Sequence, residues 1–339
     1  MGRSPSDLIV FIGKRVLLMI PTLFGVLVIT FYLSIVAVQN PCLFWFPKIK
    51  PAQVPGCEAH FGLNQPIIVR FFDYLGQLVA GNWGTTPAGV PVLPQVLAAT
   101  PETIELVLAA LVLMIGVGIP LGVIAANYSG RLFDHLVRIF YLSGWAMPTY
   151  LGALFLALIV GPALGLPYQG DFSNATPSFP QPTHFSVIDA LLSGSLANTW
   201  DAIAHLILPA LALAFLNLGI ATRMTRSSML ETLPLDYVKT ARMKGLSEFW
   251  VLYKHALRNS LITTTTVLGV TGGQLLGSTV VIEEIFNWPG IGRYAFTALT
   301  QGWFPAVYAV VIIFALGVII ANLAADVLYG VLDPRVDWR

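Results

Sequence analysis

Six long apolar stretches dominate this sequence and decide what it can fold into. A helix needs about 20 apolar residues to cross the hydrocarbon core of a bilayer, where lipid offers no partner to exposed backbone groups. Of the 339 residues, 56% are hydrophobic and only 10% are charged, far below the charged share of a soluble domain. The stretches cover residues 16–38, 106–126, 140–166, 202–222, 261–282 and 304–330. The sequence therefore predicts an all-α transmembrane bundle of six helices.

Basic residues are distributed unevenly among the segments that connect these stretches. Fourteen of the eighteen Lys and Arg residues fall in alternate segments, namely 1–15, 127–139, 223–260 and 331–339. Because cytoplasmic loops of membrane proteins carry the excess of Lys and Arg, we expect both termini in the cytoplasm of a multi-pass protein of the cell membrane. Residues 39–99 then form an extracytoplasmic segment between the first span, 16–38, and a core of five spans, 100–330. The net charge of +1 gives no support for a nucleic-acid partner.

The extracytoplasmic segment contains both cysteines of the chain, Cys42 and Cys57. A disulfide persists outside the cytoplasm, so the two can form a bridge that closes a short loop, or remain free thiols. Their spacing matches no zinc site, and the chain has no His, Asp and Glu cluster with metal-ligand spacing. No metal is therefore expected. An amphipathic stretch, 65–79, follows the cysteines and predicts a short helix at the membrane surface or a platform for an extracytoplasmic partner.

The segment 223–260 is long for a linker and has a helical pattern on each side of Gly245. A glycine at this position allows a turn that a Cβ would obstruct, and Ser247 with Glu248 is typical of the start of a second helix. The expected structure is a short helix, a tight turn and a helix that leads into the fifth span. Two interpretations remain open: a basic anchor on anionic lipid, or a docking element for a cytoplasmic protein.

The chain shows no sign of its own catalysis. A P-loop needs two glycines five residues apart followed by Lys and Ser or Thr, and the Gly13-Lys14 pair fails this pattern. Gly269, Gly273 and Gly277 recur every four residues, which favours close helix packing. The spans lack ionisable residues suited to a proton relay and lack an evident inverted repeat, which counts against a secondary transporter.

A few polar residues in or beside the spans are candidates for other roles. Gln274 in the fifth span is a candidate for lining a solute path. Glu102 and Glu105 are expected to favour the N-terminus of the second span through the helix dipole. Four residues after the fifth span are expected to contact a binding protein or to hold an outer gate: Glu283, Glu284, Asn287 and Trp288.

Several motifs together resemble a known family. The string from Asp236 to Leu246, DYVKTARMKGL, followed by His255-Ala256-Leu257, resembles the cytoplasmic EAA loop of ABC importer permeases, and more specifically their dipeptide/oligopeptide/nickel branch. Other strings agree in order and spacing over nearly the whole chain: Lys14–Phe31, Phe61–Pro66, Gly81–Gly84, Gly118–Gly122, His205–Leu211, Val281–Arg293 and Leu332–Arg335. Lys239 and Arg258 depart from the wider superfamily pattern, which has Glu and Pro there. Residues 39–60 also depart, so nothing is carried over to them.

The resemblance implies a type I ABC importer permease with a coupling helix between the fourth and fifth spans. The residues expected to couple to an ATPase lie in the EAA-type loop, about 223–260: Asp236, Tyr237, Lys239, Thr240, Ala241, Arg242, Lys244, Gly245 and Leu246. Implied partners are a second, similar permease subunit, two cytoplasmic ATPases and an extracytoplasmic solute-binding protein. ATP and Mg²⁺ would bind the ATPases, and this chain would bind no cofactor and act as a transport subunit, not an enzyme.

The expected function is passage of a peptide-like or oligosaccharide solute that a binding protein delivers and ATP hydrolysis drives. An ATP-independent solute channel or a secondary transporter is the alternative, and an intramembrane enzyme is a more distant one. A channel has no need of a structured basic hairpin, and an enzyme needs convergent catalytic groups at one depth. Retention of an ATPase by the purified chain is the observation that separates these classes.

Overall fold

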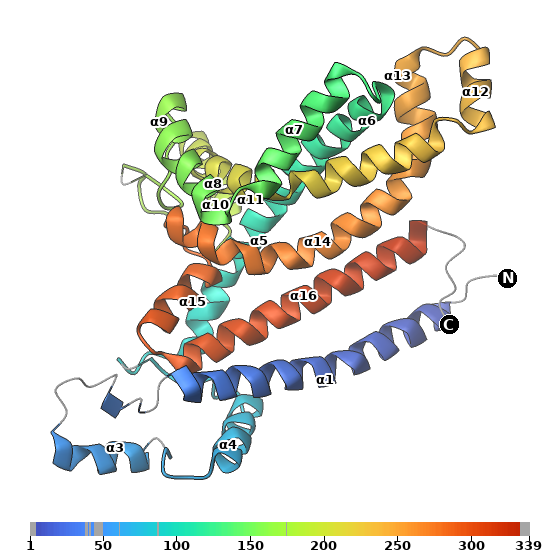
Figure 1. Cartoon of the computed structure of the whole chain (residues 1–339). Coiled ribbons are helices and arrows are strands. Elements are labelled where there is room, and N and C mark those ends of the chain that lie inside the picture. Colours follow the sequence, from blue (N-terminus) through green and yellow to red (C-terminus); the bar gives the residue numbers. More distant parts are fainter. Residues whose placement is uncertain are drawn as a thin grey trace.

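The computed structural model describes residues 5–37, 40, 42–43, 50–60, 62–86, 88–173 and 175–332, and this part of the chain is nearly all helical (Figure 1). Residues 1–4 and 333–339, parts of the expected N-terminal segment and tail, lie outside it. Five helices are long and apolar enough to cross a membrane. They are α1 (Pro5–Ala37), α5–η2–α6 (Val92–Leu113, Met114–Gly118 and Ile119–Asn127), α11 (Leu196–Thr232), α13–η4–α14 (Glu248–Trp250, Val251–Ala256 and Leu257–Ile285) and α16 (Phe304–Leu332).

The third predicted span is not one straight helix, and the expectation of a continuous span over 140–166 is wrong. Helix α7 (Leu132–Ala146) meets α8–η3–α9 (Thr149–Phe155, Leu156–Val160 and Gly161–Leu164) at an angle of 109°. The break falls at Met147, whose backbone is extended, just before Pro148. Proline disfavours the helical conformation of the preceding residue and lacks an N–H of its own. If α7 and α8–η3–α9 together cross the membrane as one broken span, the chain has six spans.

Helix α11 is the centre of the bundle. It packs against α14, α5–η2–α6 and α7, and it is the most buried of the five long helices. Its apolar side chains Leu208 and Leu213 are fully buried with Leu106 and Met114 of the α5–η2 helix and Leu275 of α14. Because lipid tails are as apolar as these side chains, close van der Waals packing and not release of water stabilises this contact between the spans.

Helix α1 lies along α16 at the edge of the bundle (Figure 1). Near its C-terminal end, Phe31 packs against Tyr308 of α16 and Phe71 of α4 (Ile67–Val79). Near its other end, Arg15 forms an ion pair of 3.1 Å with Asp326 of α16. Contacts with α16 at both ends therefore fix α1 against the bundle. The amphipathic stretch 65–79 is the helix α4, with Phe71 buried.

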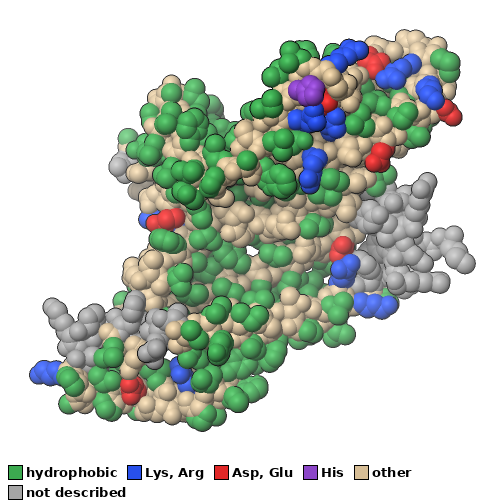
Figure 2. Space-filling model, in the orientation of Figure 1, with side chains coloured by type: hydrophobic (Ala, Val, Ile, Leu, Met, Phe, Trp, Pro, Cys, Tyr) green, Lys and Arg blue, Asp and Glu red, His purple; other side chains and the backbone are tan. Residues whose placement is uncertain are grey.

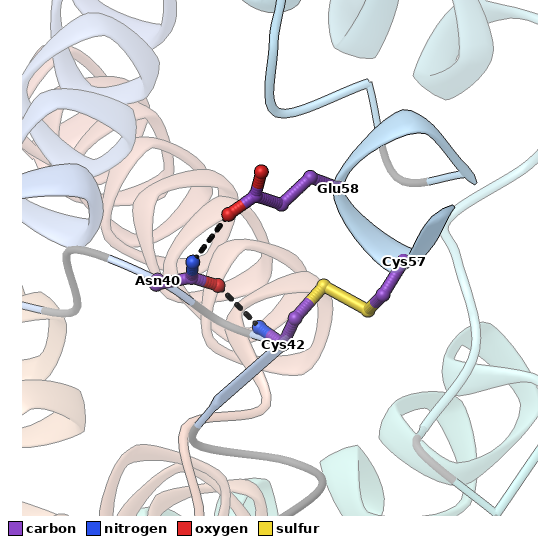
Figure 3. Close-up of a disulfide and its surroundings, with 4 residues drawn as sticks. All are labelled: Asn40, Cys42, Cys57 and Glu58. Atoms are coloured by element: carbon purple, nitrogen blue, oxygen red, sulfur yellow. Dashed lines mark hydrogen bonds between the residues drawn. A yellow bond between two sulfur atoms is a disulfide. The ribbon is translucent and has the colours of Figure 1, made fainter. Parts of the chain in front are cut away.

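The segment between α1 and α4 contains a disulfide between Cys42 and Cys57, which lies in α3 (Val54–His60) (Figure 3). The Asn40 side chain lies beside the disulfide. Its amide Nδ2 donates to Glu58 Oε1 over 2.6 Å, and its Oδ1 accepts from the backbone N–H of Cys42 over 3.0 Å. The disulfide and the Asn40–Glu58 hydrogen bond hold the chain after α1 against α3.

The glycines that recur every four residues in α14 do not all lie against a neighbouring helix. This difference gives a matched test of packing. A Cβ on Gly269 would clash with Ala325 of α16, whereas a Cβ on Gly277 would meet nothing within 4 Å. We expect Gly269→Val to cost about 1–3 kcal/mol of stability through overpacking and to lower the unfolding temperature of the purified chain by several degrees. Gly277→Val is the control, because it adds the same β-branched side chain in open space. Equal unfolding temperatures for the two variants would contradict the α14–α16 contact.

Candidate functional site

The hairpin between the α11 and α14 spans has the helix–turn–helix form that its sequence pattern predicts. Helix α12 (Asp236–Met243) ends at a turn where Gly245 has a positive φ of 75°. The Gly245 N–H donates to the Arg242 carbonyl over 2.9 Å. A side chain here would strain the left-handed backbone by about 1–2 kcal/mol. Ser247 lies at the start of the second helix, but its hydroxyl makes no capping hydrogen bond, contrary to expectation.

The inner face of α12 fixes the hairpin to the ends of the spans. Val238 and Ala241 are buried, three residues apart on one helix face. They pack into a cluster with residues of four other elements: Val123 and Ala126 of α6, Met229 of α11, Val251, Leu252 and Ala256 of η4, and Leu257 of α14. Ala241 is 5% exposed and faces the bundle, so it anchors α12 and does not itself touch a partner. Its expected role in coupling stays a prediction.

The remaining predicted coupling residues all lie on exposed parts of the hairpin: Asp236, Tyr237, Lys239, Thr240, Arg242, Lys244, Gly245 and Leu246. Arg242 Nη2 donates to Glu248 Oε1 over 2.7 Å and joins α12 to the following helix. This hydrogen bond raises the pKa of the Arg242 guanidinium above its ordinary value. Lys239 pairs with Asp236 within α12 over 3.0 Å. These charges hold the hairpin in shape while they remain open to a partner.

Large apolar side chains project from the same tip into solvent. Met243 is 80% exposed, and Leu246, Phe249 and Trp250 are also exposed. The sequence pattern did not separate Met243 from Val238 and Ala241, because a short helix with several apolar residues leaves its buried face ambiguous. Met243 follows Ala241 by two residues, a rotation of about 200° that places it on the opposite face. The result is an apolar tip surrounded by charged residues.

At the other end of the bundle, Glu283 is buried and not available to a partner. Its Oε1 accepts from Thr103 Oγ1 over 2.7 Å, and its Oε2 accepts from the backbone N–H of Arg293 over 2.9 Å. Trp288 is fully buried as well, and its indole N–H donates to the Glu102 carbonyl over 3.0 Å. These contacts connect α14, α15 (Ile291–Thr300) and α5. Glu283 and Trp288 are therefore buried and do not present a surface to a binding protein, and their expected alternative role in an outer gate stays a prediction.

Glu284 and Asn287 differ from these neighbours because both are exposed. Asn287 has a positive φ of 53°, in the turn between α14 and α15. Asparagine tolerates this conformation better than most residues. These two side chains are the part of the predicted outer contact that the structure leaves accessible.

Glu102 and Glu105 are not at a helix N-terminus, contrary to expectation. Helix α5 begins at Val92, so both lie deep inside it, and both are buried. Glu102 Oε1 accepts from Ser186 Oγ over 2.7 Å, and Glu105 Oε1 accepts from the Val187 N–H over 3.1 Å. The two carboxyl groups therefore hold the start of α10 (Ser186–Leu192) against α5.

One face of α14 is exposed along its whole length, and Gln274 lies on it. From 263 to 284 the exposed residues follow one another at intervals of seven, four, three, four and three, which fits the 3.5-residue repeat of a seam between helices with one position skipped: Thr263, Val270, Gln274, Gly277, Val281 and Glu284. Exposure of the Gln274 amide, the Thr263 hydroxyl and the Glu284 carboxylate to lipid would cost free energy. This face of α14 therefore suits a protein partner or an aqueous path better than hydrocarbon. Gln274 as a path-lining residue stays a prediction.

A cavity of about 920 Å³ opens near the start of α11, between that helix and the loop that precedes α10. Asp201 on its wall accepts from the Ser173 N–H over 2.8 Å and from Thr176 Oγ1 over 2.5 Å, and His205 Nδ1 lies 2.8 Å from the Asp201 carbonyl.

In the described ranges, no group of three or more His, Cys, Asp and Glu side chains is placed to hold a metal ion.

Comparison with known proteins decides the family. The model of the family described as binding-protein-dependent transport system inner membrane component matches residues 118–338, from the end of η2 through the α12 hairpin and α16. The chain belongs to this family. It is a multi-pass membrane component of a binding-protein-dependent transport system, and its helical architecture is that of an ABC importer permease.

Three relatives match almost from end to end. The chain is 40% identical to the di/tripeptide transport system permease protein DppB of Pseudomonas aeruginosa, over 96% of this chain and 98% of that protein. It is 39% identical to the probable D,D-dipeptide transport system permease protein DdpB of Escherichia coli, over 92% and 93%. It is 34% identical to the oligopeptide transport system permease protein AppB of Bacillus subtilis, over 97% and 99%.

Proposed function

We propose that this permease forms half of a path for short peptides, and that ATP hydrolysis on partner subunits drives it through the α12 hairpin. The observation that carries the proposal is the hairpin itself. Its inner face is anchored in the bundle through Val238 and Ala241, and its outer face presents the apolar tip of Met243 and Leu246 among charges. An anchored element with an exposed apolar tip suits transmission of force from a protein that binds the tip.

In this proposal two cytoplasmic ATPases bind ATP and Mg²⁺, and each permease subunit contacts one of them. The hairpin and both chain termini lie on the cytoplasmic side, in line with the excess of basic residues there. Closure of the ATPases moves α12, and the continuous helix from Glu248 to Ile285 carries the movement toward the outer end. Because Arg242 and Glu248 join α12 to this helix, the two move together.

The solute path lies along the exposed face of α14, opposite a second permease of the same family. Gln274 provides an amide on this face, and Gly277 leaves room beside it. An extracytoplasmic binding protein docks at the outer end, where Glu284 and Asn287 are accessible. The heterodimeric pairing explains why one face of a spanning helix carries both polar and small residues.

Peptides are the favoured solute class. The names of the three relatives each specify peptide transport, and each relative matches more than nine-tenths of the chain. The oligosaccharide interpretation has no comparable support, and neither does the ATP-independent channel. The selectivity among peptides is assigned to the binding protein, which is a separate chain.

The test is a tagged purification of the chain from gently solubilised native membranes, with mass spectrometry of the retained proteins. We expect a second permease, P-loop ATPases and a binding protein, and we expect the captured binding protein to bind dipeptides or oligopeptides in preference to oligosaccharides or Ni²⁺. Recovery of a homo-oligomer alone, which passes solute without ATP, would contradict the proposal and favour a channel.

A further inference from the structure

Helix α4 has more apolar surface than its contacts with the rest of the chain cover. Phe71 is buried against α1 and α16, and Tyr74 packs beside it on the same side of the helix. A second apolar stripe stays open: Ile68 is 71% exposed, Val79 is 83% exposed, and Phe72 between them is exposed as well. These three residues lie within about 40° of one another around the helix. An exposed apolar stripe of this kind indicates contact with something outside the chain.

The polar side chains of α4 lie on a different side of the helix from this stripe. Asp73 and Gln77 are exposed, and Arg70 is half-buried. All three lie about 100–160° around the helix from Phe72. A helix with one apolar and one polar side is typical of the boundary between lipid headgroups and hydrocarbon.

The depth of α4 follows from its contacts with α1. The ring centre of Phe71 lies 5.4 Å from that of Phe31 and 5.8 Å from that of Phe24. Both phenylalanines of α1 belong to the stretch Ile12–Val36, which is long and apolar enough to cross a membrane. Phe31 precedes the end of this stretch by a rise of only about 7.5 Å, and Phe24 lies deeper still. Helix α4 therefore lies beside the membrane-spanning part of α1 and runs across its direction (Figure 1).

The apolar stripe of α4 is continuous with the exposed surface of α1. The Phe72 ring centre lies 5.5 Å from that of Phe71, which contacts Phe24, and Phe24 is itself exposed. Only 11% of the most apolar part of α1 is buried inside the molecule, and hydrophobic side chains spread over α1 and α4 (Figure 2). A surface that joins the exposed side of a spanning helix, at the depth of that helix, suits acyl chains better than water.

We propose that α4 is an interfacial helix whose stripe of Ile68, Phe72 and Val79 inserts among the acyl chains of one leaflet. Asp73 and Gln77 then face the headgroups and water. With both termini in the cytoplasm, this leaflet is the extracytoplasmic one. The insertion anchors the segment that follows the disulfide and braces α1 against α16. It involves neither the α12 tip nor the exposed face of α14.

The test uses electron paramagnetic resonance of nitroxide labels on the purified full-length chain in phosphatidylcholine liposomes. The two native cysteines form the disulfide, so Phe72→Cys and Gln77→Cys each add one free thiol for the label. Oxygen concentrates in hydrocarbon, whereas a water-soluble nickel chelate is excluded from it. We expect the chelate to collide with the label of Phe72→Cys about tenfold less often than with that of Gln77→Cys, and oxygen to collide with it more often. Val79→Cys should behave as Phe72→Cys does, and Asp73→Cys as Gln77→Cys does.

Three results would overturn the proposal. Frequent collisions of the chelate with the labels of both Phe72→Cys and Val79→Cys would place the stripe in water. Exclusion of both oxygen and the chelate from these labels would show that protein covers the stripe. Photo-crosslinking from Phe72→benzoylphenylalanine in native membranes should give a phospholipid adduct, and an adduct with a binding protein or a second permease would instead make α4 a docking platform. Gel filtration and non-reducing electrophoresis check that each variant is folded and keeps the native disulfide.

Discussion

Replacement of Met243 by Asp is expected to reduce solute uptake at least tenfold while the permease remains folded in the membrane. Met243 is 80% exposed at the tip of α12, so its replacement removes little packing within the chain. A central apolar contact of an interface contributes about 2 kcal/mol or more, which corresponds to a loss of affinity of about thirtyfold. The measurement is peptide uptake by cells that carry the variant, together with the amount of permease in their membranes.

Met243→Leu is the matched control for this variant, because it keeps an apolar side chain of similar volume and should preserve uptake. Ala241→Asp provides the opposite comparison, two residues away. Its carboxylate would be buried in the cluster that anchors the hairpin, so we expect loss of the folded hairpin as well as loss of uptake. Normal uptake by a stable Met243→Asp permease would show that the tip of α12 does not bind the ATPase.

Replacement of Glu283 by Ala is expected to destabilise the α15 end of the bundle by about 3 kcal/mol. The Glu283 carboxylate accepts hydrogen bonds from Thr103 and from the Arg293 N–H inside a closed environment. Each buried donor left without an acceptor costs about 1–3 kcal/mol. The measurement is the unfolding temperature of the solubilised permease, with protease cleavage of the 286–303 segment as a local readout.

Glu284→Ala is the control for Glu283→Ala, because the neighbouring glutamate has the same side chain in an exposed position. We expect it to unfold at the wild-type temperature and to be cleaved at the wild-type rate. If Glu283→Ala behaves in the same way as Glu284→Ala, the carboxylate does not connect α14, α15 and α5.

The spans and the family motifs could be predicted from the sequence because both depend on local patterns. Long apolar stretches identify helices in lipid without any knowledge of tertiary contacts. The break in the third span was missed although Pro148 is visible, because high hydropathy on both sides of a proline conceals a change of direction. The helix of the second span begins earlier than the apolar stretch 106–126, because α5 starts at Val92 and includes Pro101 in its interior.

The orientation of side chains was the part that local patterns could not supply. Glu283 and Glu284 are adjacent and identical, yet one is buried and the other exposed. Only the arrival of Thr103 and Arg293 from other segments makes burial of Glu283 favourable. In the same way, the predicted coupling residues include Ala241 and omit Met243, while the structure places Ala241 inside the bundle and Met243 at the exposed tip.

Site-specific photo-crosslinking at Met243 in native membranes tests the central claim most directly. The account predicts that Met243→benzoylphenylalanine forms an adduct with a P-loop ATPase. The same substitution at Phe296, which is exposed on α15 at the opposite end of the bundle, should form no such adduct. An adduct of the Met243 position with lipid alone would contradict the account, because it would make the hairpin a membrane anchor and leave the permease without a coupling element.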